Sequence, residues 1–247
     1  MNIDVSYDPD HDFFDAYGIS GLHKGLEKPS AFKNSTLAFI ENCKSKPDMR
    51  YDIRTTSDQL GFKQRRFYEV INVFETIGCC PKVDSETFVW IGFDQTRYTI
   101  ERIANEHGVF YPNYTLEDIF CNHGCISVQR VTEEFLLLFI SLERRKINIL
   151  EASSFLSRDN DREKTTRCKL YQVAAILEIA KIIRKTEKPS EFELLPEYFI
   201  KASDKMKKGE NDPISLLALL NRPEPFCLDM VCPAINSRIR EYYSFNE

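Results

Sequence analysis

The sequence predicts an α+β protein in which three helices followed by a β-hairpin occur twice in tandem. Apolar residues at helical spacing and short runs of β-forming residues follow one another in the same order in both halves of the 247-residue chain. The third helix of each half can also be aligned at a constant offset of 103 residues. The aligned pairs include Phe67 and Leu170, Tyr68 and Tyr171, Glu75 and Glu178, and Lys82 and Lys185. A fixed offset with matching element order indicates an internal duplication.

The first repeat is expected over residues 30–95. Gly61 and Gly78 are predicted to end its second and third helices, because glycine readily adopts the left-handed backbone that closes many helices. The hairpin strands are expected on either side of a polar Asp84-Ser85-Glu86 turn. The expected helices and strands lie at residues 31–43, 56–60, 63–77, 79–83 and 87–91.

The second repeat is expected over residues 127–200, and we expect it to pack against the first as an intramolecular pseudo-dimer. The remaining segments are interpreted as an acidic irregular arm (1–29), a linker (96–126) and a C-terminal tail (201–247). In this tail a short helix is predicted at 214–220, a loop at 205–211, and irregular chain around the prolines. The helices and strands of the second repeat are expected at residues 128–143, 149–156, 167–180, 182–186 and 191–195.

Charge is distributed unevenly along a chain whose net charge is −5. Residues 31–98 carry ten basic and nine acidic side chains, and residues 126–190 carry thirteen and nine, whereas the flanking segments are acidic. A locally basic surface is what phosphate attraction requires, even in an acidic protein. No apolar run approaches the ~18–20 residues of a membrane helix, and the N-terminus lacks the pattern of a signal peptide. The eight cysteines are therefore interpreted as reduced thiols of a cytosolic or nuclear protein.

Three short helices and a hairpin describe a winged-helix domain, whose third helix is suited to the DNA major groove. In the first repeat this helix carries Arg65 and Arg66 near its start. Arg65, Glu69 and Asn72 are expected on the outward face, roughly opposite the core face that includes Phe67 and Val70. A guanidinium group can bind O6 and N7 of guanine bidentately, at ~1–3 kcal/mol of discrimination per good contact. The alternative is a solvated arginine pair on an amphipathic helix.

Residues 65–78 closely resemble the recognition helix of the E2-factor/DP family of winged-helix cell-cycle transcription factors. Its Arg-Arg-x-Tyr-Asp motif is matched by Arg65, Arg66 and Tyr68, with Glu69 in place of the aspartate. Residues 35–40 and 88–92 resemble the first helix and the last strand of the family domain. The resemblance implies a nuclear, sequence-specific regulator of transcription that recognises a GC-centred promoter element in double-stranded DNA.

The second repeat resembles the same family less well, because Cys168 and Lys169 stand at the arginine positions, and Gln172 and Ala175 replace the motif Asp and Asn. Two such domains in one chain, without sustained heptads, resemble the atypical tandem subgroup. That resemblance implies a repressor of cell-cycle genes, although the sequence alone does not separate activation from repression. The second domain is expected to contact mainly phosphate or to serve as a built-in dimerisation partner.

We therefore predict base contacts from Arg65 and Arg66, with Lys63, Gln64 and Tyr68 positioning the helix on the DNA. Further predicted DNA-binding residues are Lys82, Arg167, Lys169, Tyr171 and Lys185. Transcriptional cofactors are candidate partners, and the chain is expected to act as a monomer with an internal pseudo-dimer or as a homodimer. No membrane partner, cofactor, metal or catalytic residue is predicted.

Other interpretations remain open at this level. A winged helix can serve as a protein–protein adaptor, which the acidic net charge and the divergent second motif would fit. Cys121, His123 and Cys125 could supply zinc ligands, but no second ligand pair stands at a suitable spacing. Cys79 and Cys80 are interpreted as buried thiols rather than a redox site. An enzyme is the least supported class, because no catalytic constellation is visible.

Overall fold

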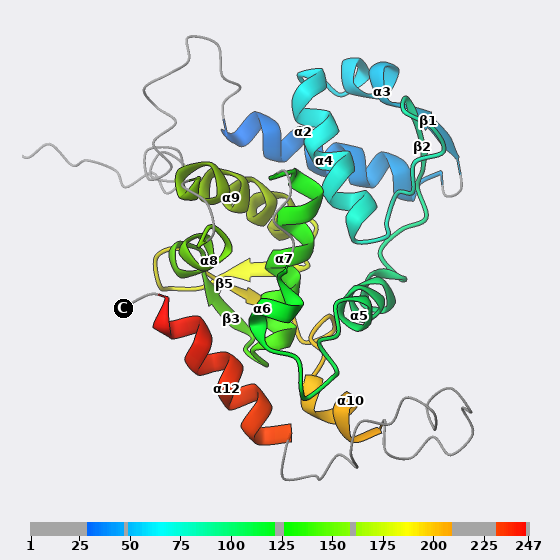
Figure 1. The fold of residues 1–247 in the computed structure, drawn as a ribbon. Helices are drawn as coiled ribbons and strands as arrows, with labels where there is room; N and C mark the ends of the chain where they lie inside the picture. The colour runs from blue at the N-terminus through cyan, green and yellow to red at the C-terminus, as the bar shows by residue number, and fades with distance from the viewer. Residues whose placement is uncertain (1–28, 47–48, 122–125, 159–161, 209–230, 246–247) are drawn as a thin grey trace, which may run out of the picture.

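The computed structural model describes residues 29–46, 49–121, 126–158, 162–208 and 231–245 of a mixed α+β protein (Figure 1). We call residues 29–92 the first unit and residues 128–195 the second unit. Among the described residues, no helix is long and apolar enough to cross a membrane.

The first unit contains three helices and a small antiparallel sheet. Phe39 lies at the centre of its core, with ring centroids 5.1–6.1 Å from those of Phe67, Phe74, Phe88 and Trp90. The chain turns back at Asp84 as expected, and the Asp84 carboxylate accepts hydrogen bonds from the backbone of Glu86 and Thr87. The strand expected at 79–83 is not regular, because Lys82 makes only an isolated bridge to Phe88. In chain order the elements are α2 (Pro29–Lys44), β1 (Arg50–Asp52), α3 (Ile53–Gln59), α4 (Gln64–Thr76) and β2 (Thr87–Val89).

The second unit repeats this order of elements. A short strand between the first and second helices pairs with the last strand in both units: β1 with β2, and β3 with β5. The sequence did not predict β1 or β3, because each has only three residues and directly precedes a helix. The elements of the second unit are α7 (Val128–Ser141), β3 (Lys146–Asn148), α8 (Ile149–Leu156), α9 (Glu163–Ile179), β4 (Ile183–Lys185) and β5 (Glu191–Leu194).

Local contacts also recur between the units. Buried Thr36 and Thr132 each donate a hydroxyl hydrogen bond of 2.8 Å to the carbonyl four residues earlier in the first helix of their unit. Buried Ser57 and Ser153 each donate one of 2.8 Å to the carbonyl three residues earlier in the second helix. These details go beyond the shared element order, because amphipathic periodicity alone does not dictate them.

The third helices end in the same turn, at the 103-residue offset seen in the sequence. The amide of Cys79 donates to the Phe74 carbonyl at 2.8 Å, and the amide of Ile182 donates to the Leu177 carbonyl at 2.9 Å. Gly78 adopts φ +79° in the first turn, and a Cβ there would clash with the side chain of Thr99. Gly78 therefore lets the neighbouring helix approach, as well as supplying the left-handed backbone.

The segment between the units, expected to be a linker, folds into α5 (Thr96–Glu106) and α6 (Leu116–Ile119). Buried Ile100, Ile103 and Ala104 place one face of α5 in the core, and α5 packs against α7. The apolar residues of α5 recur at helical spacing, so the local sequence pattern already indicates this helix.

The C-terminal tail contains more regular structure than expected. The predicted loop at 205–211 is wrong over most of its length, because α10 spans Ala202–Lys208. The chain around Cys232 and Pro233 is also not irregular: it forms the first turn of α12 (Val231–Ser244), where proline is tolerated because the first amides lack helical partners. Helix α9 begins four residues earlier than predicted. The helix predicted at 214–220 and nearly all of the acidic arm lie outside the described residues.

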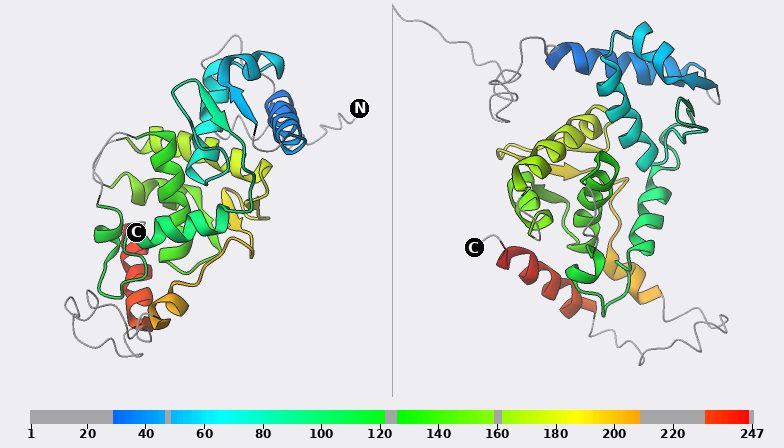
Figure 2. Two further views of the ribbon diagram at one scale, coloured as in Figure 1. Left: turned by 90° about the vertical axis from the view of Figure 1, so that its right-hand side faces the viewer. Right: turned by 45° about the horizontal axis from the view of Figure 1, so that its top comes forward.

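Helix α12 is held against the segment between the units by hydrogen bonds from a buried arginine. Arg238 is 1% exposed and donates to the carbonyls of Val109 (2.9 Å), Tyr111 (2.8 Å) and Tyr114 (2.9 Å). Burial lowers the pKa of this guanidinium to about 10, so the group remains charged at neutral pH. In both views of Figure 2, α12 lies at the end of the molecule remote from α2 and α3.

Replacing Arg238 by methionine should lower the free energy of unfolding by about 2–4 kcal/mol. The buried Val109 carbonyl left without a donor costs ~1–3 kcal/mol, and the part-buried carbonyls of Tyr111 and Tyr114 cost less because water can reach them. Urea denaturation followed by circular dichroism measures this change. Arg240→Met on the same helix is the matched control, because Arg240 is exposed and should change stability by no more than about 0.5 kcal/mol. Equal effects of the two substitutions would show that the hydrogen bonds of Arg238 do not stabilise the docking of α12.

Candidate nucleic-acid interface

The first turn of α4 has the features of an anion-binding helix terminus. Lys63, the residue that precedes the helix, has an extended backbone and makes no side-chain capping hydrogen bond. The first turn contains no acidic residue. Uncapped amides and the helix dipole together attract phosphate or other electron-rich groups.

The two predicted base-contacting arginines differ in their surroundings. Arg65 is exposed, and no ion pair of its guanidinium is found among the described residues. Arg66 has a side chain 28% exposed, and its Nη1 donates to Glu69 Oε2 at 2.7 Å. Glu69 therefore holds the Arg66 guanidinium in one direction, while Arg65 keeps the freedom to reach outward.

The predicted positioning residues lie on the same end of α4. Lys63 and Gln64 are exposed, whereas Tyr68 is half-buried and packs against the hydrophobic core. The five residues that the sequence assigned to the first recognition helix therefore lie together at the N-terminal end of α4, although their side chains point in different directions around the helix axis. Lys63, Gln64 and Arg65 are the exposed ones.

The remainder of α4 is covered. Helix α4 packs against α7 and α9 of the second unit as well as against its own core, and Figure 1 shows it descending toward α7. Ile71 and Val73, beyond the second turn, are therefore fully buried. The outward face expected to continue from Arg65 through Glu69 to Asn72 is exposed only at its beginning, because no local pattern in the sequence marks a second packing surface.

Lys82, predicted to contact phosphate from the first wing, is engaged within the protein. Its ammonium group donates to Asn72 Oδ1 at 2.6 Å and lies 2.8 Å from Glu75 Oε2. Gln129 of α7 donates to the same Glu75 oxygen at 2.8 Å. This cluster connects the wing, α4 and the second unit, and sequence reasoning missed Gln129 because nothing in its local pattern marks it.

The predicted residues of the second unit do not form an equivalent exposed group. Arg167 lies 3.7 Å from Glu163, and Lys169 donates to the carbonyl of Ile126. Tyr171 is 7% exposed and is hydrogen-bonded to Ser190 Oγ at 2.7 Å. Lys185 alone of these four is exposed, on β4.

Helix α3, which precedes the recognition helix, is capped by Asp52. A carboxylate oxygen of Asp52 accepts a hydrogen bond from the Thr55 amide at 2.7 Å, and this backbone bond lowers the pKa of the carboxyl group. The cap fixes the start of α3 beside β1 and so helps to set where the turn into α4 begins.

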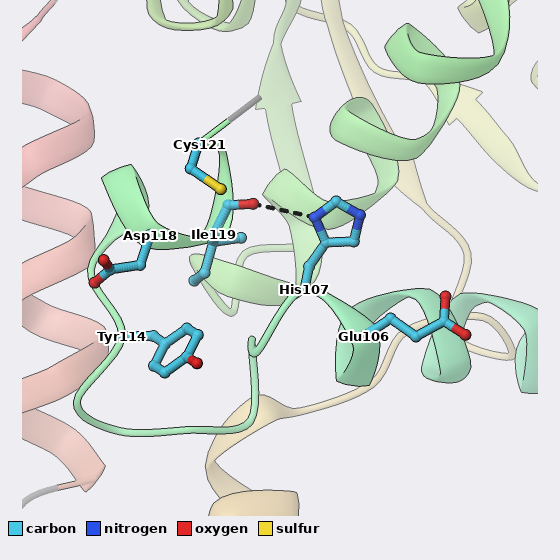
Figure 3. Close-up of a pocket in the computed structure, with 6 residues that line it drawn as sticks. All are labelled: Glu106, His107, Tyr114, Asp118, Ile119 and Cys121. Carbon is cyan, nitrogen blue, oxygen red and sulfur yellow. Dashed lines mark hydrogen bonds between the residues drawn. The ribbon is translucent and has the colours of Figure 1, made fainter. Parts of the chain in front are cut away.

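An open pocket of about 530 Å³ lies away from this interface, between the end of α5 and α6 (Figure 3). His107 donates from Nδ1 to the Ile119 carbonyl at 3.1 Å. The carboxylates of Glu106 and Asp118 stand on opposite sides of the pocket and do not converge. Across the described part of the chain, no three His, Cys, Asp or Glu side chains are placed to hold a metal. Of the zinc ligands considered from the sequence, Cys121 is exposed, and His123 and Cys125 lie outside the described residues.

The adjacent cysteines at the start of the first wing are buried. Burial raises the pKa of the Cys79 thiol to about 12 and that of the Cys80 thiol well above its usual value. Both thiols therefore stay protonated at physiological pH, which makes them poor nucleophiles and poor redox centres.

Three helices, a wing and an uncapped basic helix terminus define the first unit as a winged-helix module suited to nucleic acid. Residues 28–92 match the family model of the E2-factor/DP family winged-helix DNA-binding domain. This match confirms the fold of the first unit and supports double-stranded DNA binding and transcription regulation, in a family of transcription factors rather than enzymes.

No curated protein and no solved structure matches the chain significantly. The match to the family model covers the first unit, so the second unit is described by its own geometry.

Acidification should weaken the α3 cap. Because the pKa of Asp52 is lowered in the folded state, its stabilising effect is present above the unfolded value of about 3.9 and is lost as pH falls through the folded value. Asp52→Asn keeps a capping oxygen without the titrating charge, so its melting temperature should fall less than that of the unmodified protein between about pH 6 and about pH 2.5. Asp52→Ala, the control, should melt lower at pH 6 and converge with the unmodified protein in acid. An identical pH response of all three proteins would contradict the capping role.

Proposed function

We propose that the protein is a sequence-specific regulator of transcription that inserts the first turn of α4 into the major groove of a GC-centred DNA element. The observation that carries this proposal is the exposed guanidinium of Arg65 at an uncapped, acid-free helix terminus, within a domain that matches a DNA-binding family. Guanine offers two acceptors in the major groove, at the spacing of a guanidinium fork.

The other residues at this end of α4 take complementary roles in the proposal. Arg66 is oriented by Glu69, which reduces the conformational freedom lost when its guanidinium contacts a second base. Lys63 and Gln64, beside the uncapped amides, position the helix against the phosphate backbone, and Tyr68 supports the helix from its half-buried side. For Lys82 to contact phosphate, its ammonium group has to give up the hydrogen bond to Asn72 and the ion pair with Glu75.

We further propose that the two units are duplicated winged-helix domains arranged as an intramolecular pseudo-dimer. In this arrangement α2 corresponds to α7, and α4 corresponds to α9. The contact of α4 with α7 then has a counterpart in that of α9 with α2, and α4 meets α9 directly. Such reciprocal contacts are typical of a two-fold interface.

The tandem arrangement is the basis for assigning the chain to the atypical E2-factor/DP subgroup. Nuclear location and repression of cell-cycle genes follow from that assignment as proposals. Transcriptional cofactors remain proposed partners, and a homodimer remains the alternative to a monomer with an internal pseudo-dimer.

Arg65→Ala and Arg66→Ala should each remove preference for a GC-centred duplex. Loss of a bidentate contact costs ~1–3 kcal/mol, which is a factor of about 5 to 150 in affinity for the specific site. Binding to random duplex should fall much less, because it depends on phosphate contacts. Gel-shift titration of both duplexes at physiological salt measures the two affinities.

Arg240→Ala is the control for this experiment, because it removes an exposed arginine from a helix at the far end of the molecule. It should leave both affinities unchanged. If a specific duplex is bound equally well after Arg65 and Arg66 are replaced together, the assignment of these residues is wrong. If the unmodified protein retains no DNA, the protein–protein adaptor becomes the supported function.

A further inference from the structure

The two units present different chemistry at corresponding positions, which bears on how the chain would contact a two-part DNA element. The correspondence rests on the shared turn at the ends of α4 and α9. The donors of its closing hydrogen bond, Cys79 and Ile182, and the acceptors, Phe74 and Leu177, are both separated by 103 residues. At this offset the four residues Lys63, Gln64, Arg65 and Arg66 correspond to Thr166, Arg167, Cys168 and Lys169.

Three of these four residues in the second unit have no group that could contact a base from an exposed position, and only Arg167 carries a guanidinium. Thr166 is 2% exposed, and Cys168, which replaces the exposed Arg65, is half-buried. The ammonium group of Lys169 donates to the Ile126 carbonyl, so the position of Arg66 is held by an internal contact. Arg167 is left, and its guanidinium lies 3.7 Å from the carboxylate of Glu163.

The start of α9 is also unlike that of α4. Helix α9 begins at Glu163, which corresponds by the same offset to a position four residues before the start of α4. The extra turn places a carboxylate at the helix terminus, whereas the first turn of α4 has none. A carboxylate there repels phosphate and competes with it for the uncapped amides.

The second unit instead exposes positive charge on its hairpin. Residues 181–194 contain four basic and three acidic side chains, whereas residues 79–91 contain one basic and two acidic. Lys185 corresponds to Lys82 but is exposed, and no ion pair of its side chain is found among the described residues. One reason is that Ala175 replaces Asn72, which accepts a hydrogen bond from Lys82 in the first unit.

We propose that the chain recognises base sequence on one side of its DNA element, through Arg65 and the first turn of α4, and holds the other side by sequence-independent phosphate contacts from the β4–β5 hairpin, with Lys185 as the principal contact. This inference rests on the proposed DNA-binding function. It assigns a specificity role to one unit and an affinity role to the other.

Selection of binding sites from a random duplex library, with the full chain, tests the division directly. The expected motif is asymmetric, with strong base preference in one half and none in the other. A palindromic motif would overturn the inference while leaving the proposed function intact. Failure to enrich any sequence would overturn the proposed function itself and, with it, the inference.

Two substitutions separate the roles of the units. Lys185→Ala should weaken binding to the selected site and to random duplex by the same factor, of about 3 to 10, and should lower the salt slope by about one. It should leave the selected motif unchanged. Lys201→Ala, which removes an exposed lysine outside both units, is the matched control and should change neither affinity.

Arg167→Ala combined with Lys169→Ala tests the second recognition helix, and repeated selection should return the same motif as the unmodified chain. Loss of base preference in any part of that motif would show that α9 contacts bases and would overturn the inference. Thermal unfolding of each variant confirms that it is folded under the binding conditions. If stability falls, Arg167→Ala alone replaces the double variant, because the ammonium group of Lys169 is already held by the Ile126 carbonyl. A change of motif caused by Lys185→Ala would contradict the phosphate role of the hairpin.

Discussion

The arrangement of the protein depends on the burial of α4 on two sides. One side of this helix supplies Phe67, Val70 and Phe74 to the core of the first unit, and the other packs against α7 and α9. Because the C-terminal part of α4 is enclosed, its orientation is set by two packed surfaces rather than by loops. The exposed residues of α4 lie in its first turn, and they include Arg65.

Double burial also explains the polar cluster beside α4. Glu75 lies where the wing and α7 both approach the helix, and it accepts hydrogen bonds from Lys82 and Gln129 at 2.8 Å. A half-buried carboxylate without such partners would be costly. The cluster therefore satisfies polar groups that the interface partly removes from water, and it also ties the wing to the second unit. In the second unit Ala175 stands at the position of Asn72, so the exposed Lys185 lacks the side-chain acceptor that Lys82 has in the first unit.

The net charge of the chain says little about its partner, because charge acts locally at protein surfaces with a screening length of about 8–10 Å. Acidic residues dominate the termini and the segment between the units, whereas α4 begins without any acid. In an acidic chain whose basic residues are confined to a small surface, the affinity for an anionic partner depends on a few specific contacts. Non-specific attraction over the whole surface is weak in such a protein.

Local signals in the amino-acid sequence were sufficient to predict the three helices of the first unit and its exposed basic turn, but not its strand β1. The apolar spacing, Gly61, Gly78 and the Arg65–Arg66 pair each act through the chain within a few residues. The second unit was also visible, through the constant offset between the two third helices. Which predicted residues are available, in contrast, depends on packing in three dimensions. Lys82, Lys169 and Tyr171 are engaged by groups distant in sequence, and α12 is held by three carbonyls more than a hundred residues away. Such pairings depend on how packed surfaces meet, and no local periodicity encodes them.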